Sequence, residues 1–182
     1  MTAQKAFRDA LLVEIPVMRA FARALCRDRD AADDLVQDAL LAAWKSQLAL
    51  RDVSCLKSWL LQIVRNAYLR TVQSRARSRT EVLRDGDEYA GQTGGEDDLV
   101  DGEDARAVLM QLAPADREAI VLVVVHGLNY DEAGQVCGCP AGTVKSRVNR
   151  AKSKMRAALS QDRQEHGNGN RLPPSKLAGR AA

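Results

Sequence analysis

Apolar residues recur along this chain at spacings of three and four, the pattern of helices that bury one face. In the first 80 residues this pattern predicts three helices, over about residues 11–25, 31–46 and 55–79. Pro16 interrupts the first helix, so we expect a kink or a fresh helix start there. Asp30 stands at the expected N-cap of the second helix, where its carboxylate can accept a hydrogen bond from a backbone amide.

Four further helices are predicted in the second half of the chain. A short one covers about residues 105–112. Pro114 occupies a first-turn position and opens the next helix, which is expected to end near residues 126–127.

The last two predicted helices are joined by a short turn with the sequence CGCP. Asn129 and Glu132 have the spacing of a capping box at the start of the first of them, and Gly138 is expected to close it. Pro140 then precedes the longest and most basic helix, over about residues 141–159. Two helices in this arrangement predict a helix-turn-helix, although a solvated basic surface is the alternative interpretation of the last helix.

Composition and charge extend this picture. Aromatic residues make up only 4% of the chain, which favours an all-α protein. Residues 1–80 carry 14 Lys and Arg against 8 Asp and Glu, residues 81–104 carry 1 against 10, and residues 105–182 carry 12 against 6. The acidic block is rich in glycine and predicts a flexible linker, a mere tether in the simplest interpretation. The two basic blocks that flank it suggest two helical domains, each contacting a polyanion.

Several classes of function find no support in the sequence. The chain has no run of eighteen apolar residues and no secretory signal, so we expect a cytoplasmic protein without a membrane span. It shows no nucleophile–base pair or phosphate loop, and we expect no enzyme and no cofactor. Cys137 and Cys139 lack the two further ligands of a zinc site, so we expect no metal and treat the cysteines as packing residues. Residues 161–182 are polar and are expected to be disordered.

The last predicted helix presents three kinds of surface around its axis. One sector is apolar and is expected to pack inward: Val144, Val148, Ala151, Met155 and Leu159. The opposite side, here called the crest, carries side chains that can reach base edges in a major groove: Ser146, Asn149, Arg150 and Ser153, with Thr143 at its N-terminal edge. Between them lie cationic shoulders suited to the flanking phosphates: Lys145, Lys152 and Arg156 on one side, Arg147 and Lys154 on the other.

Three segments of the chain resemble regions 2 and 4 of extracytoplasmic-function sigma factors, which direct RNA polymerase to promoters. They are DRDAADDLVQDALLAAWKS, SCLKSWLLQIVRNAYLRTVQSRARSR and LAPADREAIVLVVVHGLNYDEAGQVCGCPAGTVKSRVNRAKSKM. The segments IPVMRAFARAL and CGCPAGTVKSRVNRA most resemble the general-stress, EcfG-like class. The resemblance implies a region 2 helical bundle over residues 1–80 and a region 4 helix-turn-helix over residues 105–160, joined by the acidic linker 81–104.

The resemblance also implies partners. In this family the DDLVQ helix binds the clamp helices of the polymerase β′ subunit, which assigns core binding to Asp33, Asp34, Leu35, Val36, Gln37 and Asp38. Asp33 and Asp34 are equally typical of an ordinary helix start. Further expected partners are the polymerase β flap and a NepR-like anti-sigma factor.

Promoter contacts are implied in both regions. Residues 48–54 and the helix after them correspond to the part that contacts the −10 element, although this loop lacks the expected Phe and Gly. On that helix we expect Asn66 and Arg70 to bind DNA, within a basic series that suits the DNA backbone: Arg65, Arg70, Arg75, Arg77 and Arg79. Trp59 is expected in the core. One set of residues in the last helix is expected to bind the −35 element: Thr143, Lys145, Ser146, Arg147, Asn149, Arg150 and Ser153.

The leading interpretation is therefore a sigma factor in a general stress response under anti-sigma control. A sigma-like decoy that sequesters the anti-sigma factor is the alternative, but decoys carry a receiver domain, for which residues 160–182 are too few. A helix-turn-helix repressor would not explain DDLVQDALLAAW beside SWLLQIVRN.

Overall fold

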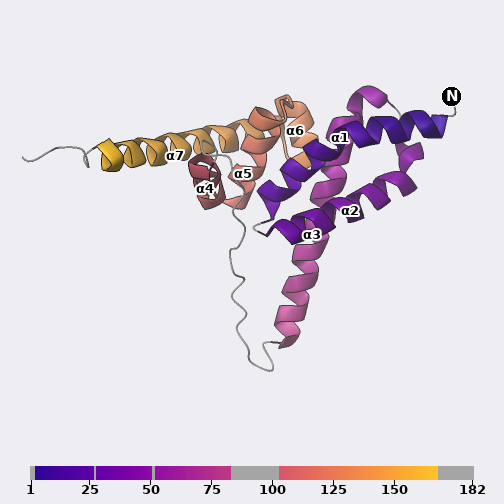
Figure 1. The fold of residues 1–182 in the computed structure, drawn as a ribbon, viewed down its shortest axis with the longest axis horizontal. Coiled ribbons are helices and arrows are strands. Elements are labelled where there is room, and N and C mark those ends of the chain that lie inside the picture. The colour runs from indigo at the N-terminus through magenta and orange to yellow at the C-terminus, as the bar shows by residue number, and fades with distance from the viewer. Residues whose placement is uncertain (1–2, 27, 51, 83–102, 168–182) are drawn as a thin grey trace, which may run out of the picture.

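The computed structural model describes residues 3–26, 28–50, 52–82 and 103–167, and the regular elements in these ranges are all helical (Figure 1). The prediction of an all-α protein is therefore confirmed. Most of the predicted acidic linker lies outside the described residues. Its two ends are helical, because the third helix continues to Val82 and the fourth begins at Glu103.

The first half of the chain is a three-helix bundle of α1 (Ala3–Leu25), α2 (Arg29–Lys45) and α3 (Leu56–Val82). The connection from α2 to α3 contains two short 3₁₀ turns, η1 (Gln47–Ala49) and η2 (Val53–Cys55). Fully buried side chains from α1 and α3 fill its core: Met18, Phe21, Leu60, Leu61 and Val64.

The structure decides two expectations about the ends of these helices. Helix α1 starts at Ala3 and runs through Pro16, which excludes a fresh start at the proline and leaves the kink as the remaining alternative. The N-cap of α2 is Asp28 rather than Asp30, because Asp28 has the extended backbone of a cap and accepts a hydrogen bond of 2.8 Å from the amide of Ala31. Asp30 lies two residues later, in the first turn of the helix, where a negative charge interacts favourably with the positive end of the helix dipole.

The second half contains α4 (Glu103–Gln111), α5 (Pro114–Ile120), α6 (Tyr130–Cys137) and α7 (Ala141–Gly167). A π-helical turn, η3 (Val121–Val125), extends α5, and the His126 amide donates to the Val121 carbonyl at 3.0 Å. Pro114 is at the start of α5, as predicted. Residues 161–167 are helical instead of disordered, and the rest of the predicted tail lies outside the described residues.

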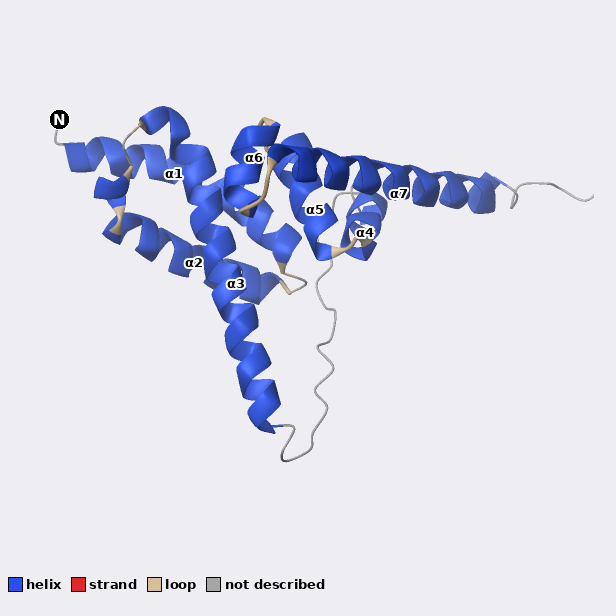
Figure 2. Cartoon of the chain, turned by 180° about the vertical axis from the view of Figure 1, so that it is seen from behind, coloured by secondary structure: helices blue, strands red, loops and turns tan. Residues whose placement is uncertain are grey.

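The two halves pack against each other rather than standing apart. Helix α6 lies on α3, and α1 lies against α5 and η3, an arrangement visible from both sides of the molecule (Figures 1 and 2). The buried ring of Phe21 in α1 meets the ring of His126 edge-on, with the centroids 5.9 Å apart. One hydrophobic core therefore runs through both halves.

Candidate nucleic-acid and polymerase interface

Helix α6 begins with the predicted capping box. The side chain of Asn129 accepts hydrogen bonds from the amides of Asp131 and Glu132 at 3.0 and 2.9 Å, and the Glu132 carboxylate accepts from the Asn129 amide at 2.8 Å. These bonds satisfy backbone donors that a helix start otherwise leaves unpaired. The first helix of the helix-turn-helix is thus fixed by local sequence.

The turn between α6 and α7 is closed by two glycines with different roles. Gly138 has a φ of 64°, the left-handed conformation that glycine adopts without strain, and its amide donates to Gln135. The Cys139 amide donates to the Gly134 carbonyl at 3.0 Å, completing a Schellman motif. A Cβ on Gly134 would lie 2.7 Å from the Cys139 carbonyl oxygen. The role of Gly134 was not predicted, although a glycine inside a helical pattern is its signal in the sequence.

The faces of α7 lie as its sequence pattern predicts. Val144, Val148 and Ala151 are fully buried, Met155 is half-buried, and the Leu159 side chain lies outside the described residues. The crest residues are all exposed: Ser146, Asn149, Arg150 and Ser153. Lys145 is also exposed, whereas Thr143 and Arg147 are half-buried. The predicted −35 set therefore lies along one helix, largely outside the core.

Two of these arginines have partners within the protein. Arg150 donates to Ser146 Oγ at 3.0 Å and pairs with the buried carboxylate of Asp116 at 2.9 Å. Arg147 reaches the sulfur of Cys139 at 3.6 Å. The contacts hold Arg150 and Ser146 together on the crest. Asp116 in α5 was missed by sequence reasoning, because nothing local links it to a helix more than thirty residues away.

The predicted core-binding residues divide between the surface and the core of α2. Asp34, Gln37 and Asp38 are exposed, and Asp33 is half-buried, 3.8 Å from Arg19. Leu35 and Val36 are only 5% and 2% exposed. Their apolar side chains pack into the bundle, and their assignment to core binding stays a prediction. The exposed members of this predicted set, Asp34, Gln37 and Asp38, carry carboxylate or amide groups.

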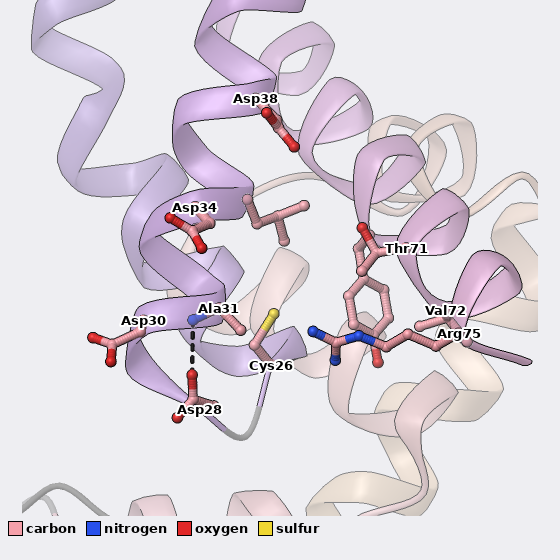
Figure 3. A pocket seen from close by; sticks show the side chains of 11 residues that line it. Cys26, Asp28, Asp30, Ala31, Asp34, Asp38, Thr71, Val72 and Arg75 are labelled. Carbon is pink, nitrogen blue, oxygen red and sulfur yellow. Dashed lines mark hydrogen bonds between the residues drawn. The ribbon is translucent and has the colours of Figure 1, made fainter. Parts of the chain in front are cut away.

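An acidic cavity of about 380 Å³ lies between α2 and α3 (Figure 3). Four carboxylates line the α2 side: Asp28, Asp30, Asp34 and Asp38. Arg75 extends from α3 toward Cys26 at the end of α1. Burial raises the pKa of the Cys26 thiol, and the Arg75 guanidinium offsets part of this rise. The cavity suits a cationic side chain of a partner protein.

An apolar groove of about 410 Å³ lies between α1 and α2. Its walls are aliphatic and aromatic: Leu11, Leu12, Ile15, Leu40, Leu41 and Trp44. Arg8 and Gln37 stand among the lining residues, so the groove is continuous with the exposed side of α2. Leu12 and Leu41 are more than half exposed.

The residues predicted to contact the −10 element are on the surface of the first half. Asn66 and Arg70 are exposed on α3, and Leu48 in the preceding loop is 96% exposed. Trp59 is half-buried and packs against the core, with its ring 6.4 Å from that of Phe7. These residues do not converge with the crest of α7, because the later part of α3 and α7 point in different directions (Figure 1).

The basic series of α3 is not uniformly available. Arg65 is half-buried and forms an ion pair with Glu118 in α5. Arg77 is exposed, and the side chain of Arg79 lies outside the described residues. Burial raises the pKa of Glu118, and the Arg65 guanidinium opposes that rise. The sequence did not predict that Arg65 and Glu118 would pair.

The described residues hold no group of three or more His, Cys, Asp or Glu side chains arranged to bind a metal ion. Cys137 is buried beside Glu118, and burial raises the pKa of its thiol to about 12. Within the same ranges no helix is long and apolar enough to cross a membrane.

Comparisons with known proteins match both halves of the chain. Residues 13–78 match the family model for Sigma-70 region 2, and residues 103–155 match that for Sigma-70, region 4. The chain is 39% identical over 166 residues to the ECF RNA polymerase sigma factor EcfG of Rhodopseudomonas palustris, covering 89% of this chain and 90% of that protein.

Two solved structures have similar folds. The sigma factor RpoE from Bartonella quintana, in complex with the anti-sigma factor NepR, matches with a TM-score of 0.74 and 36% identity, covering 87% of this chain and 99% of that chain. CnrH, in complex with the cytosolic domain of CnrY, matches with a TM-score of 0.62 and 27% identity, covering 87% of this chain and 90% of that one. Both regions match their family models, and the identity to EcfG extends over 89% of the chain. The chain therefore belongs to the extracytoplasmic-function RNA polymerase sigma factors, which are transcription initiation factors and not enzymes.

Proposed function

We propose that this sigma factor works in the cytoplasm, binds core polymerase through the exposed side of α2 and the β flap through its second half, and contacts the −35 element with α7 and the −10 element with α3. Residues 1–80 act as region 2, 105–160 as region 4, and 81–104 as the linker. The observation that carries the proposal is the surface of α7, where the inward sector is buried and the hydrogen-bonding crest is exposed.

The crest supports base recognition because its side chains can donate and accept hydrogen bonds at base edges. Exposed Lys145, Lys152 and Lys154 stand on the shoulders, where the phosphates on both sides of a major groove would lie. On this basis the crest sets the choice of sequence and the shoulders set affinity.

The exposed side of α2 supports binding to a basic partner. Asp34 and Asp38 line the cavity between α2 and α3, and Gln37 reaches the apolar groove beside it. A basic helical partner could place a cation in the cavity and an apolar side chain in the groove. The clamp helices of polymerase β′ are the partner we assign to this surface.

Control by an anti-sigma factor follows from the relatives. The structure of RpoE contains NepR, and the structure of CnrH contains part of CnrY. We propose that a NepR-like protein inhibits this chain, within a general stress response of the kind implied by the likeness to EcfG.

Run-off transcription with core polymerase on genomic fragments tests the function and maps the start sites. The starts then supply promoter duplexes for a comparison of variants. Ser146→Ala and Asn149→Ala should change the preferred −35 sequence, at a cost of about 1–3 kcal/mol where a base contact is lost. Lys152→Ala and Lys154→Ala should weaken binding to all −35 sequences alike. Each should reduce by about one the slope of the logarithm of the binding constant against the logarithm of salt concentration.

Arg150 is unsuitable for this comparison, because its removal would leave the buried carboxylate of Asp116 without its partner. If the lysine variants shift the selected motif while the Ser146 and Asn149 variants leave it unchanged, the proposed orientation of α7 on DNA is wrong. If the chain yields no discrete starts with core polymerase, the proposed promoter recognition fails altogether.

A further inference from the structure

Three side chains of α3 donate hydrogen bonds to the second half of the chain. Lys57 Nζ donates to the carbonyl oxygen of His126, and Gln62 Nε2 donates to the carbonyl oxygen of Gln135 at 3.3 Å. Arg65 Nε donates to the carboxylate of Glu118. The donors span about two turns of α3, on the side that carries α6. The two halves are therefore joined by defined hydrogen bonds as well as by the shared hydrophobic core.

The ion pair of Arg65 and Glu118 is the charged member of this set. Its side chains are 19% and 10% exposed, so both charges are largely removed from water. A carboxylate in such a place is costly if its cation is withdrawn. The pair therefore favours the arrangement in which α5 and α3 remain together.

Arg65 also belongs to the basic series of α3 that we assign to the DNA backbone. A guanidinium offers the same fork of donors to a carboxylate as to a phosphate. While Arg65 is bound to Glu118, it cannot neutralise a phosphate, and α6 covers the same stretch of α3. Closure of the two halves and the binding of DNA along α3 compete for one side chain.

We propose that the Arg65–Glu118 pair is an autoinhibitory latch, which holds the first half of this sigma factor against the second and withholds Arg65 from promoter DNA. The proposal deepens the proposed function and rests on it where it assigns α3 to DNA. Entry of DNA along α3 would replace the Glu118 carboxylate with a backbone phosphate as the partner of Arg65, and the halves could then separate.

The test compares full-length variants by small-angle X-ray scattering and by binding to a labelled promoter duplex with an unpaired −10 segment. Glu118→Gln removes the charge and keeps the size of the side chain. Asp131→Asn is the matched control, because Asp131 is an exposed carboxylate in the same half that pairs with no α3 side chain in the described contacts. Lys57→Met loosens the same interface from the other side, and circular dichroism verifies that every variant is folded.

Glu118→Gln and Lys57→Met should increase the radius of gyration, whereas Asp131→Asn should scatter like the original chain. Glu118→Gln should bind the duplex roughly 3- to 10-fold more tightly than Asp131→Asn, because more molecules are open at any moment. The exchanged pair Arg65→Glu with Glu118→Arg should restore the compact scattering profile.

Unchanged scattering from both Glu118→Gln and Lys57→Met would overturn the latch. So would a double exchange that stays as open as Glu118→Gln. If Glu118→Gln expands but binds the duplex no more tightly than Asp131→Asn, the closing role of the pair is supported while the assignment of α3 to DNA fails, so the two failures are distinguishable.

Discussion

His126 is a buried histidine at the junction of the two halves. Its ring lies against Phe21, its side chain is 6% exposed, and its Nε2 meets no hydrogen-bond partner among the described residues. Burial, together with the nearby ammonium of Lys57, lowers the pKa of His126 to about 4. The imidazole is therefore neutral in the folded protein throughout the physiological range.

Stability should fall as the pH drops from about 6.5 to about 4, because in this window the unfolded chain protonates His126 and the folded chain does not. The lowered pKa of His126 should reduce the free energy of unfolding by on the order of 3 kcal/mol across the whole window. His126→Phe should remove this dependence, since an aromatic ring without a titrating group fills the same site. Urea unfolding of both proteins at a series of pH values measures the difference.

Glu118 acts in the opposite sense, because its raised pKa lets the folded protein bind a proton before the unfolded chain does. This contribution is present in both proteins and cancels in the difference. Equal pH dependence in the original chain and in His126→Phe would contradict the assignment of a buried neutral imidazole.

At the scale of elements, the turn between α6 and α7 depends on Gly134. A Cβ at this position would meet backbone, the Cys139 carbonyl oxygen, which cannot rotate away as a side chain can. Gly134→Ala should therefore destabilise the protein by about 1–3 kcal/mol, even though alanine is the better helix former. Gly142→Ala in α7 is the control, because a Cβ there meets nothing within 4 Å.

Thermal unfolding measures both glycine variants. For a chain of this size the loss at Gly134 corresponds to a lower Tm by about 2–4 °C per kcal/mol. Gly142→Ala should leave the Tm unchanged or raise it slightly. If Gly134→Ala and Gly142→Ala unfold at the same Tm, the turn can move away from the helix without a loss of stability.

The same elements show how far local sequence determines structure. Asn129, Glu132 and Gly138 predicted both ends of α6, because each makes its hydrogen bond or adopts its conformation within a few residues. The end of α7 was placed too early, because the apolar stripe stops at about Leu159 while the next residues still favour helix until Gly167. The cap of α2 was misassigned because two aspartates lie within three positions of each other.

Contacts between the halves had no such local signal. Arg65 and Glu118 are 53 residues apart, and an arginine in a basic series is typical of a surface that binds DNA. The exposed crest of α7 could be predicted, since the pattern of one helix fixes which side is buried. The partners of Arg65 and Arg150 could not, because they depend on how separate elements dock.

At the scale of the whole molecule, Phe21 joins the two halves through its contact with His126. Phe21 is fully buried, so Phe21→Ala should cost about 3–5 kcal/mol. Hydrogen–deuterium exchange should accelerate in η3 as well as in α1, because the same ring covers both. Faster exchange confined to the first three helices would show that the halves are stabilised independently.

The hydrogen-bond acceptors between the two halves determine which mutations can change how strongly the halves are held together. Two of the three polar contacts end on main-chain carbonyl oxygens, those of His126 and Gln135, which every amino acid carries. Point mutation at either position leaves the acceptor in place, whereas mutation of Lys57 or Gln62 deletes a donor. Mutations in α3 can therefore change how strongly the two halves are held together, while the sequence of α6 changes independently.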